Sequence, residues 1–311
     1  MLIAGIDIGS GTTKAVLVGA EGRVRARSQV RTRADFKAVA QEALDRARSD
    51  AGGKPVAYVA TTGLGRYAVA ARDIQITDLT CGARGAAALF PTTRFVLDIG
   101  AQCSRAIRLR EGGKVKEFHM NEKCAAGSGG FLERAAKYLE VPLAEVGRLS
   151  LAATSPQPIS SVCAVLAESE IINHVSEGVP VEDILRGIHN SLADRALALL
   201  KRVGLDGEVT FIGGVARQAG MVAALRAKLG VPVHVPEEPE FTTALGAALL
   251  GLQRFRRLTA RRSEGDPMDR TSITIRPVEY GPAPAAERNR PLAGSTRARP
   301  GAYDAAEDAR T

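Results

Sequence analysis

The chain has 311 residues, of which 45% are hydrophobic and 24% charged, a balance typical of a globular protein with a substantial core. Aromatic residues make up only 4% of the chain and Trp is missing, which argues against a surface that stacks nucleic-acid bases on exposed rings. The formal net charge is +8, but about half of the excess falls in residues 254–311, without any recognisable nucleic-acid-binding motif.

The sequence also lacks the signals of a membrane or secreted protein. No apolar run approaches the roughly 18 residues of a membrane span, and the first residues carry neither a basic segment nor a small-residue cleavage site. We therefore expect a cytoplasmic protein that binds neither a membrane nor nucleic acid. In that reducing compartment, metal ligands or buried thiols are expected rather than disulfides at the cysteines, Cys81, Cys103, Cys124 and Cys163.

The first ninety residues predict strands and helices of an α/β unit. Residues 2–18 read as a strand, a Gly-rich turn and a returning strand, while residues 35–51 carry apolar side chains at helical spacing. Residues 55–63 read as a strand that enters a Gly turn, and residues 81–90 as a small-residue helix.

Residues 94–100 repeat the opening of the chain. The segment RFVLDIG ends like LIAGIDIG, with Asp and Gly at the end of an apolar strand, and residues 104–115 return as a hairpin. Two such units predict two related halves that face a cleft.

The rest of the chain is expected to be mostly helical. A helix is predicted after the small residues that follow Cys124, and a strand over residues 208–212 ends at a Gly-Gly pair. Further helices are predicted at 162–176, 181–203, 218–229 and 243–252. Beyond about residue 255 the chain becomes rich in Arg, Pro, Gly and Ala, which predicts disorder. The expected parts are a first half, 1–90, a second half, 91–254, and a tail, 255–311.

The segment DIGSGTTK, Asp7–Lys14, is a candidate phosphate site. It does not fit a P-loop or a Rossmann motif, because the chain returns as a strand where those motifs continue into a helix. A Gly-rich hairpin tip can still wrap phosphates with backbone N–H groups and hydroxyls, and Asp7 is placed to hold Mg²⁺ directly or through water. A plain Gly-rich hairpin remains the alternative for this motif alone. The candidate phosphate ligands are Gly9, Ser10, Gly11, Thr12, Thr13 and Lys14.

The segment DIGAQCSR, Asp98–Arg105, favours the nucleotide interpretation, because two Asp-Gly hairpins that face each other can clamp Mg-phosphate from both sides. It supplies Asp98, Gly100 and Ala101, and Gln102 is a candidate to position an attacking water. The pair Gly213 and Gly214 lets a nucleoside approach the backbone closely. These ordered motifs resemble the actin, sugar kinase and Hsp70 ATPase superfamily. The resemblance implies an α/β, duplicated actin-like fold, with ATP and Mg²⁺ between two ribonuclease-H-like halves.

Within that superfamily, residues 1–252 resemble the BadF/BadG/BcrA/BcrD ATPases, which are ATP-dependent activators and subunits of 2-hydroxyacyl-CoA dehydratases and benzoyl-CoA reductases. The motifs that carry the resemblance are ATTG (60–63), TDLTCGARGA (77–86), KCAAGSGGFLE (123–133), SSVCAVLAESE (160–170), GIHNSLADR (187–195), FIGGVA (211–216) and ALGAALLG (244–251). The resemblance implies that Cys124 and Cys163 bind a [4Fe–4S] cluster. Gly246 is assigned to the nucleotide site, and Glu133 is either a ribose ligand or a solvated helix residue.

The two cysteines suit a shared cluster on physical grounds. Cys124 and Cys163 do not have the CxxC spacing of a zinc knuckle, and each is expected just before a helix, whose N-terminal partial charge favours a thiolate. A [4Fe–4S] cluster takes four thiolates and one chain offers two here, so a dimer that bridges one cluster completes the set. Two buried free cysteines are the alternative. We expect Cys81 and Cys103 to have other roles.

The expected function is that of an ATP-hydrolysing subunit that passes low-potential electrons from a ferredoxin-like donor to subunits that bind a CoA thioester. In the family that this chain resembles, homodimeric activators usually have the sequence DIGGQDSK at the second phosphate loop, whereas this chain has DIGAQCSR. That departure favours an ATPase subunit of benzoyl-CoA reductase, an oxidoreductase of anaerobic aromatic degradation, beside a homologous second ATPase subunit. The alternatives are a homodimeric activator of a 2-hydroxyacyl-CoA dehydratase and a non-redox kinase or nucleotide sensor of the same superfamily.

Overall fold

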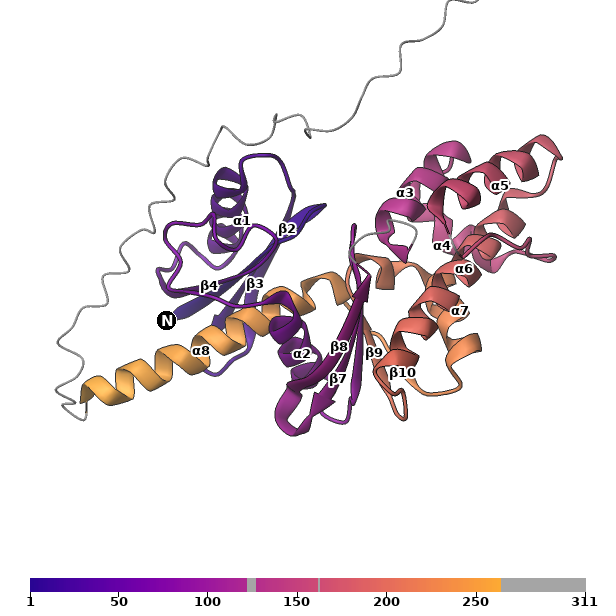
Figure 1. Cartoon of the computed structure of the whole chain (residues 1–311). Helices are drawn as coiled ribbons and strands as arrows, with labels where there is room; N and C mark the ends of the chain where they lie inside the picture. Colours follow the sequence, from indigo (N-terminus) through magenta and orange to yellow (C-terminus); the bar gives the residue numbers. More distant parts are fainter. Residues whose placement is uncertain (122–126, 162, 264–311) are drawn as a thin grey trace, which may run out of the picture. The chain divides into compact units, whose positions relative to one another are not determined.

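The computed structural model describes residues 1–121, 127–161 and 163–263, which contain two five-stranded sheets (Figure 1). The first sheet has the order β3-β2-β1-β4-β5 and the second the order β10-β9-β6-β7-β8. The strands of the first sheet are β1 (Leu2–Ile8), β2 (Thr12–Gly19), β3 (Val24–Arg31), β4 (Val56–Gly63) and β5 (Ile74–Gln75). Those of the second are β6 (Phe95–Ile99), β7 (Ser104–Arg110), β8 (Lys114–Asn121), β9 (Val209–Ile212) and β10 (Val233–His234).

The two sheets have the same topology. In each, three consecutive strands pair antiparallel, and the first of the three also pairs in parallel with a later strand that has its own parallel neighbour. The internal repeat predicted from the two Asp-Gly motifs is therefore present as a duplicated fold.

Each sheet is covered on both faces, which explains why its central strands are apolar on both sides. In the first sheet, Ala4, Ile6 and Ile8 pack against the cluster that contains α1 (Phe36–Asp50), while the alternate residue Ile3 packs against α8 (Thr242–Ser263). The start of α1 is fixed by Asp35, whose carboxylate accepts a hydrogen bond from the Ala38 N–H.

The second sheet is covered by α2 (Asp78–Leu89) on one face, where Val96 and Ile107 are buried. The helices of the other face join the largest core cluster, which includes Phe95, Leu97 and Phe131. The described helices that contribute to that cluster are α3 (Gly129–Tyr138), α4 (Leu143–Leu151), α5 (Ala164–Ser176), α6 (Val181–Arg202) and α7 (Ala219–Leu229).

Helices α2 and α8 cross at small residues. A Cβ atom on Gly246 would lie 1.8 Å from the backbone oxygen of Cys81, and a Cβ on Gly85 would lie 2.1 Å from that of Thr242. Helix α2 belongs to the first half of the expected division but packs on the second sheet. Helix α8 starts in the second half but packs on the first sheet. The expected boundary near residue 90 divides the chain between the strands of the two sheets, but helices from each side of it pack on the sheet of the other side.

Helix α8 is longer than the sequence predicts. The expected irregular tail from residue 255 is wrong for residues 255–263, because α8 runs to Ser263 and Phe255 packs on the first-sheet cluster, with its ring 6.0 Å from that of Tyr58. The rest of the predicted tail lies outside the described residues. In the described part of the chain, none of the helices has both the length and the apolar character that crossing a membrane requires.

Candidate functional site

Two buried carboxylates end the first strand of each repeat. Asp7 on β1 is 9% exposed and Asp98 on β6 is 7% exposed. Each faces a basic residue on the returning strand, since Asp7 pairs in register with Lys14 and Asp98 with Arg105. The Lys14 Nζ lies 3.7 Å from Asp7 Oδ2, and the Arg105 Nη1 lies 3.0 Å from Asp98 Oδ2.

A glycine stands beside each carboxylate, at the end of the neighbouring parallel strand. Gly63, at the end of β4, has φ +84°, and a Cβ there would lie 2.5 Å from Asp7 Oδ1. Gly213, after β9, has φ +89°, and a Cβ there would lie 2.6 Å from Asp98 Oδ1. Gly213 is a predicted site residue, whereas Gly63 belongs to a motif without an assigned role. The duplication thus extends from the fold to the site.

The two hairpin tips meet. A Cβ on Gly11 would lie 3.0 Å from the Cβ of Ala101, so the predicted phosphate loops approach within van der Waals distance. Burial raises the pKa of Asp7, and the nearby carboxylates of Asp98 and Asp78 raise it further, while Lys14 opposes the shift.

A cation suits this place. Around Asp7, the carboxylates of Asp7, Asp98 and Asp78 outnumber the cations of Lys14 and Arg105, which favours a positive ion. Mg²⁺ in nucleotide sites takes one or two carboxylates plus phosphate oxygens and water. No group of three or more side chains suited to hold a metal ion occurs among residues 1–121, 127–161 and 163–263. The residues present therefore fit a metal that arrives with its phosphate ligand better than a preformed metal cage.

The first loop is fastened by a residue that the sequence motifs do not reveal. Thr32, just after β3, donates a hydrogen bond of 2.8 Å to the Gly9 carbonyl and shares one of 2.9 Å with the Thr13 hydroxyl. Its N–H also bonds to the Gly11 carbonyl at 3.0 Å. Thr13 is fully buried, so its hydroxyl faces Thr32. The predicted phosphate ligands that remain partly accessible are Gly9, Ser10, Gly11, Thr12 and Lys14.

The second loop rests on the first turn of α3. The N–H groups of Gly129 and Gly130 donate to the carbonyls of Gly100 and Ala101 at 2.9 and 2.8 Å. Gln102 at the tip is exposed, and its role with an attacking water stays a prediction. This contact ties the nucleotide motif to the segment that follows Cys124, which the sequence alone does not suggest.

Arg105 joins three elements. Besides Asp98, its guanidinium binds Asp78 on the first turn of α2, with Nη2 to Oδ2 at 2.6 Å. Arg105 is 15% exposed, so the bridge is largely shielded from solvent. A lysine, with a single ammonium, has no planar fork with which to hold two carboxylates in this way. Asp78 lies within a motif of the family resemblance, but nothing in its spacing identifies it as a site residue.

Three other predicted residues differ in exposure. Glu133 is exposed on α3, and Gly214 is exposed after Gly213. Gly246 is buried in the crossing of α8 with α2, where close packing accounts for a glycine.

Cys163 is the N-cap residue of α5 and partly exposed, in agreement with the expected helix N-terminus. Cys124, its expected partner in cluster binding, lies outside the described residues. Burial raises the pKa of the Cys81 thiol to about 12, which suits an unreactive core residue.

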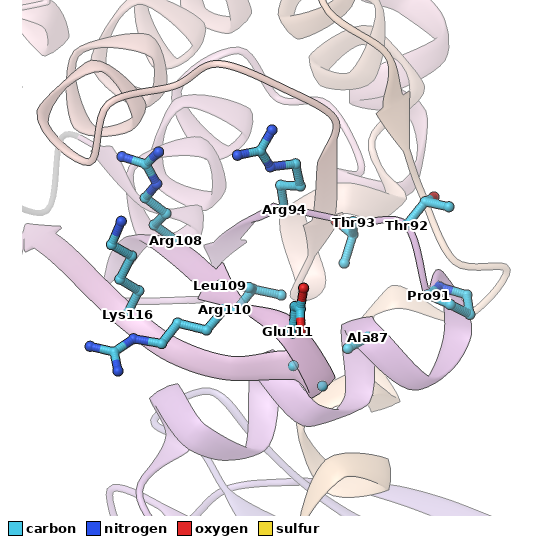
Figure 2. Close-up of a pocket in the computed structure, with 12 residues that line it drawn as sticks. Ala87, Pro91, Thr92, Thr93, Arg94, Arg108, Leu109, Arg110, Glu111 and Lys116 are labelled. Carbon is cyan, nitrogen blue, oxygen red and sulfur yellow. The ribbon is translucent and has the colours of Figure 1, made fainter.

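A basic hollow of about 600 Å³ lies at the opposite end of the second sheet (Figure 2). It is lined by Arg94, which precedes β6, by Arg108 and Arg110 near the end of β7, and by Lys116 on β8. Since Asp98 lies at the other end of β6, this hollow is separate from the paired loops.

Comparison with known proteins shows the family of the chain. The chain matches the profile of the BadF/BadG/BcrA/BcrD ATPase family over residues 4–251. It is 43% identical to the activator of lactoyl-CoA dehydratase of Anaerotignum propionicum, over 80% of this chain and 96% of that protein. It is also 43% identical to a subunit of the benzoyl-CoA reductase of Thauera aromatica, over 83% of this chain and 95% of that protein.

A solved structure shows the same fold. The activator of the 2-hydroxyisocaproyl-CoA dehydratase from Clostridium difficile, with bound ADPNP, superposes with a TM-score of 0.80 at 36% identity, over 84% of this chain and 98% of that one. The described residues thus have the duplicated actin-like ATPase fold expected from the two hairpins, and the chain belongs to the BadF/BadG/BcrA/BcrD ATPase family.

Proposed function

We propose that the chain is an ATP-hydrolysing subunit that activates electrons for an enzyme of CoA-thioester chemistry. The observation that carries the proposal is the duplicated site, in which each repeat places a buried carboxylate on its hairpin next to a glycine at the end of the neighbouring parallel strand. Membership of an ATPase family and the likeness to an activator with bound ADPNP support ATP as the nucleotide.

In this proposal each half supplies one side of the nucleotide site. The loops Gly9–Thr12 and Gly100–Ala101 surround the phosphates, and Asp7 and Asp98 hold Mg²⁺ directly or through water. In the second loop the Ala101 N–H is the donor, because the Gly100 N–H donates to the Cys103 carbonyl at 2.9 Å. Gln102 orients the attacking water, and Gly213 with Gly214 leaves room for the nucleoside. Lys14 and Arg105 keep the two carboxylates in place and offset part of their charge.

The cluster is proposed to lie at the start of α5. Cys163, at the helix N-terminus, and Cys124 supply two of four thiolates, and a second ATPase subunit supplies the others. When bound, a [4Fe–4S] cluster supplies one-electron redox chemistry. The exposed apolar side chains of α5, Val165, Leu166, Ile172 and Val175, support a partner subunit on this face.

The finer assignment is to a benzoyl-CoA reductase, with a ferredoxin-like protein as electron donor. Identity to the relatives does not choose between a reductase component and a dehydratase activator, since both stand at 43%. The sequence DIGAQCSR at the second loop, which departs from the DIGGQDSK expected of homodimeric activators, is the reason to prefer the reductase. A homodimeric activator of a 2-hydroxyacyl-CoA dehydratase is the second candidate, favoured by the superposition with such an activator.

The first experiment measures iron and acid-labile sulfide after strictly anaerobic purification, and the electron paramagnetic resonance of the reduced protein with and without ATP. We expect about four irons per dimer and a spectrum that changes with ATP. Cys163→Ser should lose the iron, while the matched Cys103→Ser should retain it. A colourless protein that still hydrolyses ATP would refute the electron-activating role.

Copurification separates the two candidates. A component of the reductase is expected in a stable complex with a second ATPase subunit and the CoA-binding subunits, whereas a dehydratase activator is expected as a homodimer that acts catalytically. Isolation of the chain as a lone homodimer that activates a 2-hydroxyacyl-CoA dehydratase would decide for the second candidate.

A further inference from the structure

Helix α5, which begins after Cys163, is lightly packed. Of its residues, all of which the structure describes, Ala167 and Ile171 are buried. Its large apolar side chains are otherwise exposed, with Val165 at 68% and Leu166 at 55%. A helix with so few buried contacts depends for its position on each polar contact that remains.

Helix α5 has polar contacts with the segment before it, from the Ser160 N–H to Glu170 Oε2 at 2.5 Å and between His174 Nε2 and the Pro158 carbonyl at 3.4 Å. It also has a polar contact with a neighbouring helix, α3. Arg134 Nε lies 2.7 Å from Glu168 Oε1, and the Tyr138 hydroxyl donates to Glu168 Oε2 at 3.4 Å. Glu168 is 21% exposed and Arg134 is 40% exposed, so water screens the pair only in part. Glu168 lies in the second turn of α5, close to the first turn that Cys163 caps through the bond from the Ala167 N–H to the Cys163 carbonyl.

The other end of α3 is bound to the second phosphate loop. The first turn of α3 donates to the carbonyls of Gly100 and Ala101, and the Ser104 hydroxyl donates to the Gly127 carbonyl. A Cβ on Gly130 would lie 2.9 Å from the Ala101 oxygen, so this approach requires a glycine. A shift of the loop therefore displaces the N-terminal turn of α3.

We propose that α3 is a lever between the nucleotide and the Cys163 helix, and that Arg134 and Glu168 form its coupling joint. This inference rests on the proposed function in taking the two hairpins as the ATP site. Arg134 and Glu168 are positioning residues, since they act through α3 and α5. A shift of the loop that carries α3 moves Arg134, and the ion pair transmits that shift to the turn of α5 next to Cys163.

The effect expected of the Arg134–Glu168 ion pair is limited in size. Partly exposed ion pairs change an equilibrium by about two- to fivefold. A coupling of that size suits a helix held by few other contacts, whereas it would be negligible for a fully buried helix.

The experiment measures amide hydrogen exchange of α5 in the full chain, with and without Mg²⁺ and ADPNP. In the wild type the nucleotide should change the exchange of residues 165–176. In Arg134→Gln and Glu168→Gln that response should fall about two- to fivefold, while the response at the first turn of α3 persists. The double charge reversal, Arg134→Glu with Glu168→Arg, should restore it.

A matched control is Asp194→Asn. It breaks a comparable exposed ion pair, Lys228 to Asp194 at 2.6 Å, which joins α7 to α6 away from this path, and it should leave the α5 response unchanged. An α5 response that is absent in the wild type, or equal in Arg134→Gln and the wild type, would overturn the proposal. A chain that lacks iron yet shows the coupled exchange would refute the electron role and leave the lever intact.

Discussion

At Gly213 the backbone has φ +89° and a carboxylate oxygen occupies the space that a side chain would take. Replacing Gly213 with Ala should therefore both strain the backbone and push Asp98 away from its position. We expect a stability loss of about 1–2 kcal/mol and a fall in kcat/KM for ATP of about 10- to 100-fold. Urea unfolding and steady-state ATPase kinetics measure the two effects.

The control for this variant is Gly230→Ala. Gly230 also has a positive φ, +65°, but nothing lies within 4 Å of a Cβ built there. It should lose similar stability and keep its ATPase activity. Equal activity losses in the two variants would show that folding, and not the position of Asp98, explains the result.

His189 is a buried side chain that makes the free energy of unfolding depend on pH. It is fully buried on α6, where Nδ1 lies 2.7 Å from the Ser150 hydroxyl, and burial lowers its pKa to about 3. At pH values between about 6.5, the pKa of histidine in the unfolded chain, and about 3, His189 is protonated in the unfolded chain but not in the folded one. The free energy of unfolding is therefore highest above pH 6.5 and decreases as the pH falls. From pH 7 to pH 5 the loss should be about 2 kcal/mol.

Urea unfolding at both pH values tests the role of His189. His189→Gln should flatten the dependence of the free energy of unfolding on pH. A wild-type slope that survives in His189→Gln would assign the dependence to other groups.

Single residues differ in how visible they are in the sequence. Asp7 and Asp98 can be predicted because each interrupts an apolar strand next to a glycine. Asp78 and Thr32 cannot, because their roles arise from contacts with residues distant in sequence. The motif predicts that Thr13 faces the phosphates, but strand alternation turns it inward to Thr32.

At the scale of elements, the crossing of α2 and α8 is the contact least tolerant of added volume. Gly246→Ala would place a Cβ 1.8 Å from the Cys81 oxygen, and both partners are helix backbones that cannot yield separately. We expect a loss of about 1–3 kcal/mol from overpacking, measured by thermal or urea unfolding. Gly214→Ala, where nothing lies within 4 Å of the new Cβ, should not change stability. Equal stability of both variants would contradict this packing.

Strands and helices with a clean apolar pattern can be predicted, and those masked by charge cannot. The pattern of β3 is hidden because VRARSQVR places arginines on its exposed face, although Ala26, Ser28 and Val30 are buried in alternation. The last part of α8 is hidden for the same reason, since its arginines obscure the packing of Phe255 and Leu258. Helix α4 is hard to recognise because it is short and lies between two longer helical patterns.

At the scale of the whole molecule, the buried Asp7 carboxylate lowers the free energy of unfolding, and bound Mg²⁺ with nucleotide should offset that loss. The pKa of Asp7 is raised by burial, so its ionised form disfavours folding and stability is lost as the pH rises through that pKa. Asp7→Asn should therefore be more stable than the wild type without nucleotide. With Mg²⁺ and ADPNP at 100 times the dissociation constant the wild type should gain about 2.7 kcal/mol, and the variant should gain much less.

Thermal unfolding with and without the nucleotide measures both effects of Asp7→Asn. Lys37→Gln, an exposed change on α1, serves as the control and should behave like the wild type. A variant that is less stable without nucleotide would show that Lys14 compensates the Asp7 charge more than burial penalises it.

The duplicated topology also separates what is shared from what is added. In the first repeat the third strand, β3, is followed by α1 and then by the parallel strand β4, and in the second repeat α6 occupies the same place before β9. Helices α3, α4 and α5 have no counterpart in the first repeat. The segment with Cys163 is therefore an insertion in the second repeat of a duplicated fold. It lies between the end of β8 and the start of α6, so its length and chemistry can change without a change in the strands that the two repeats share.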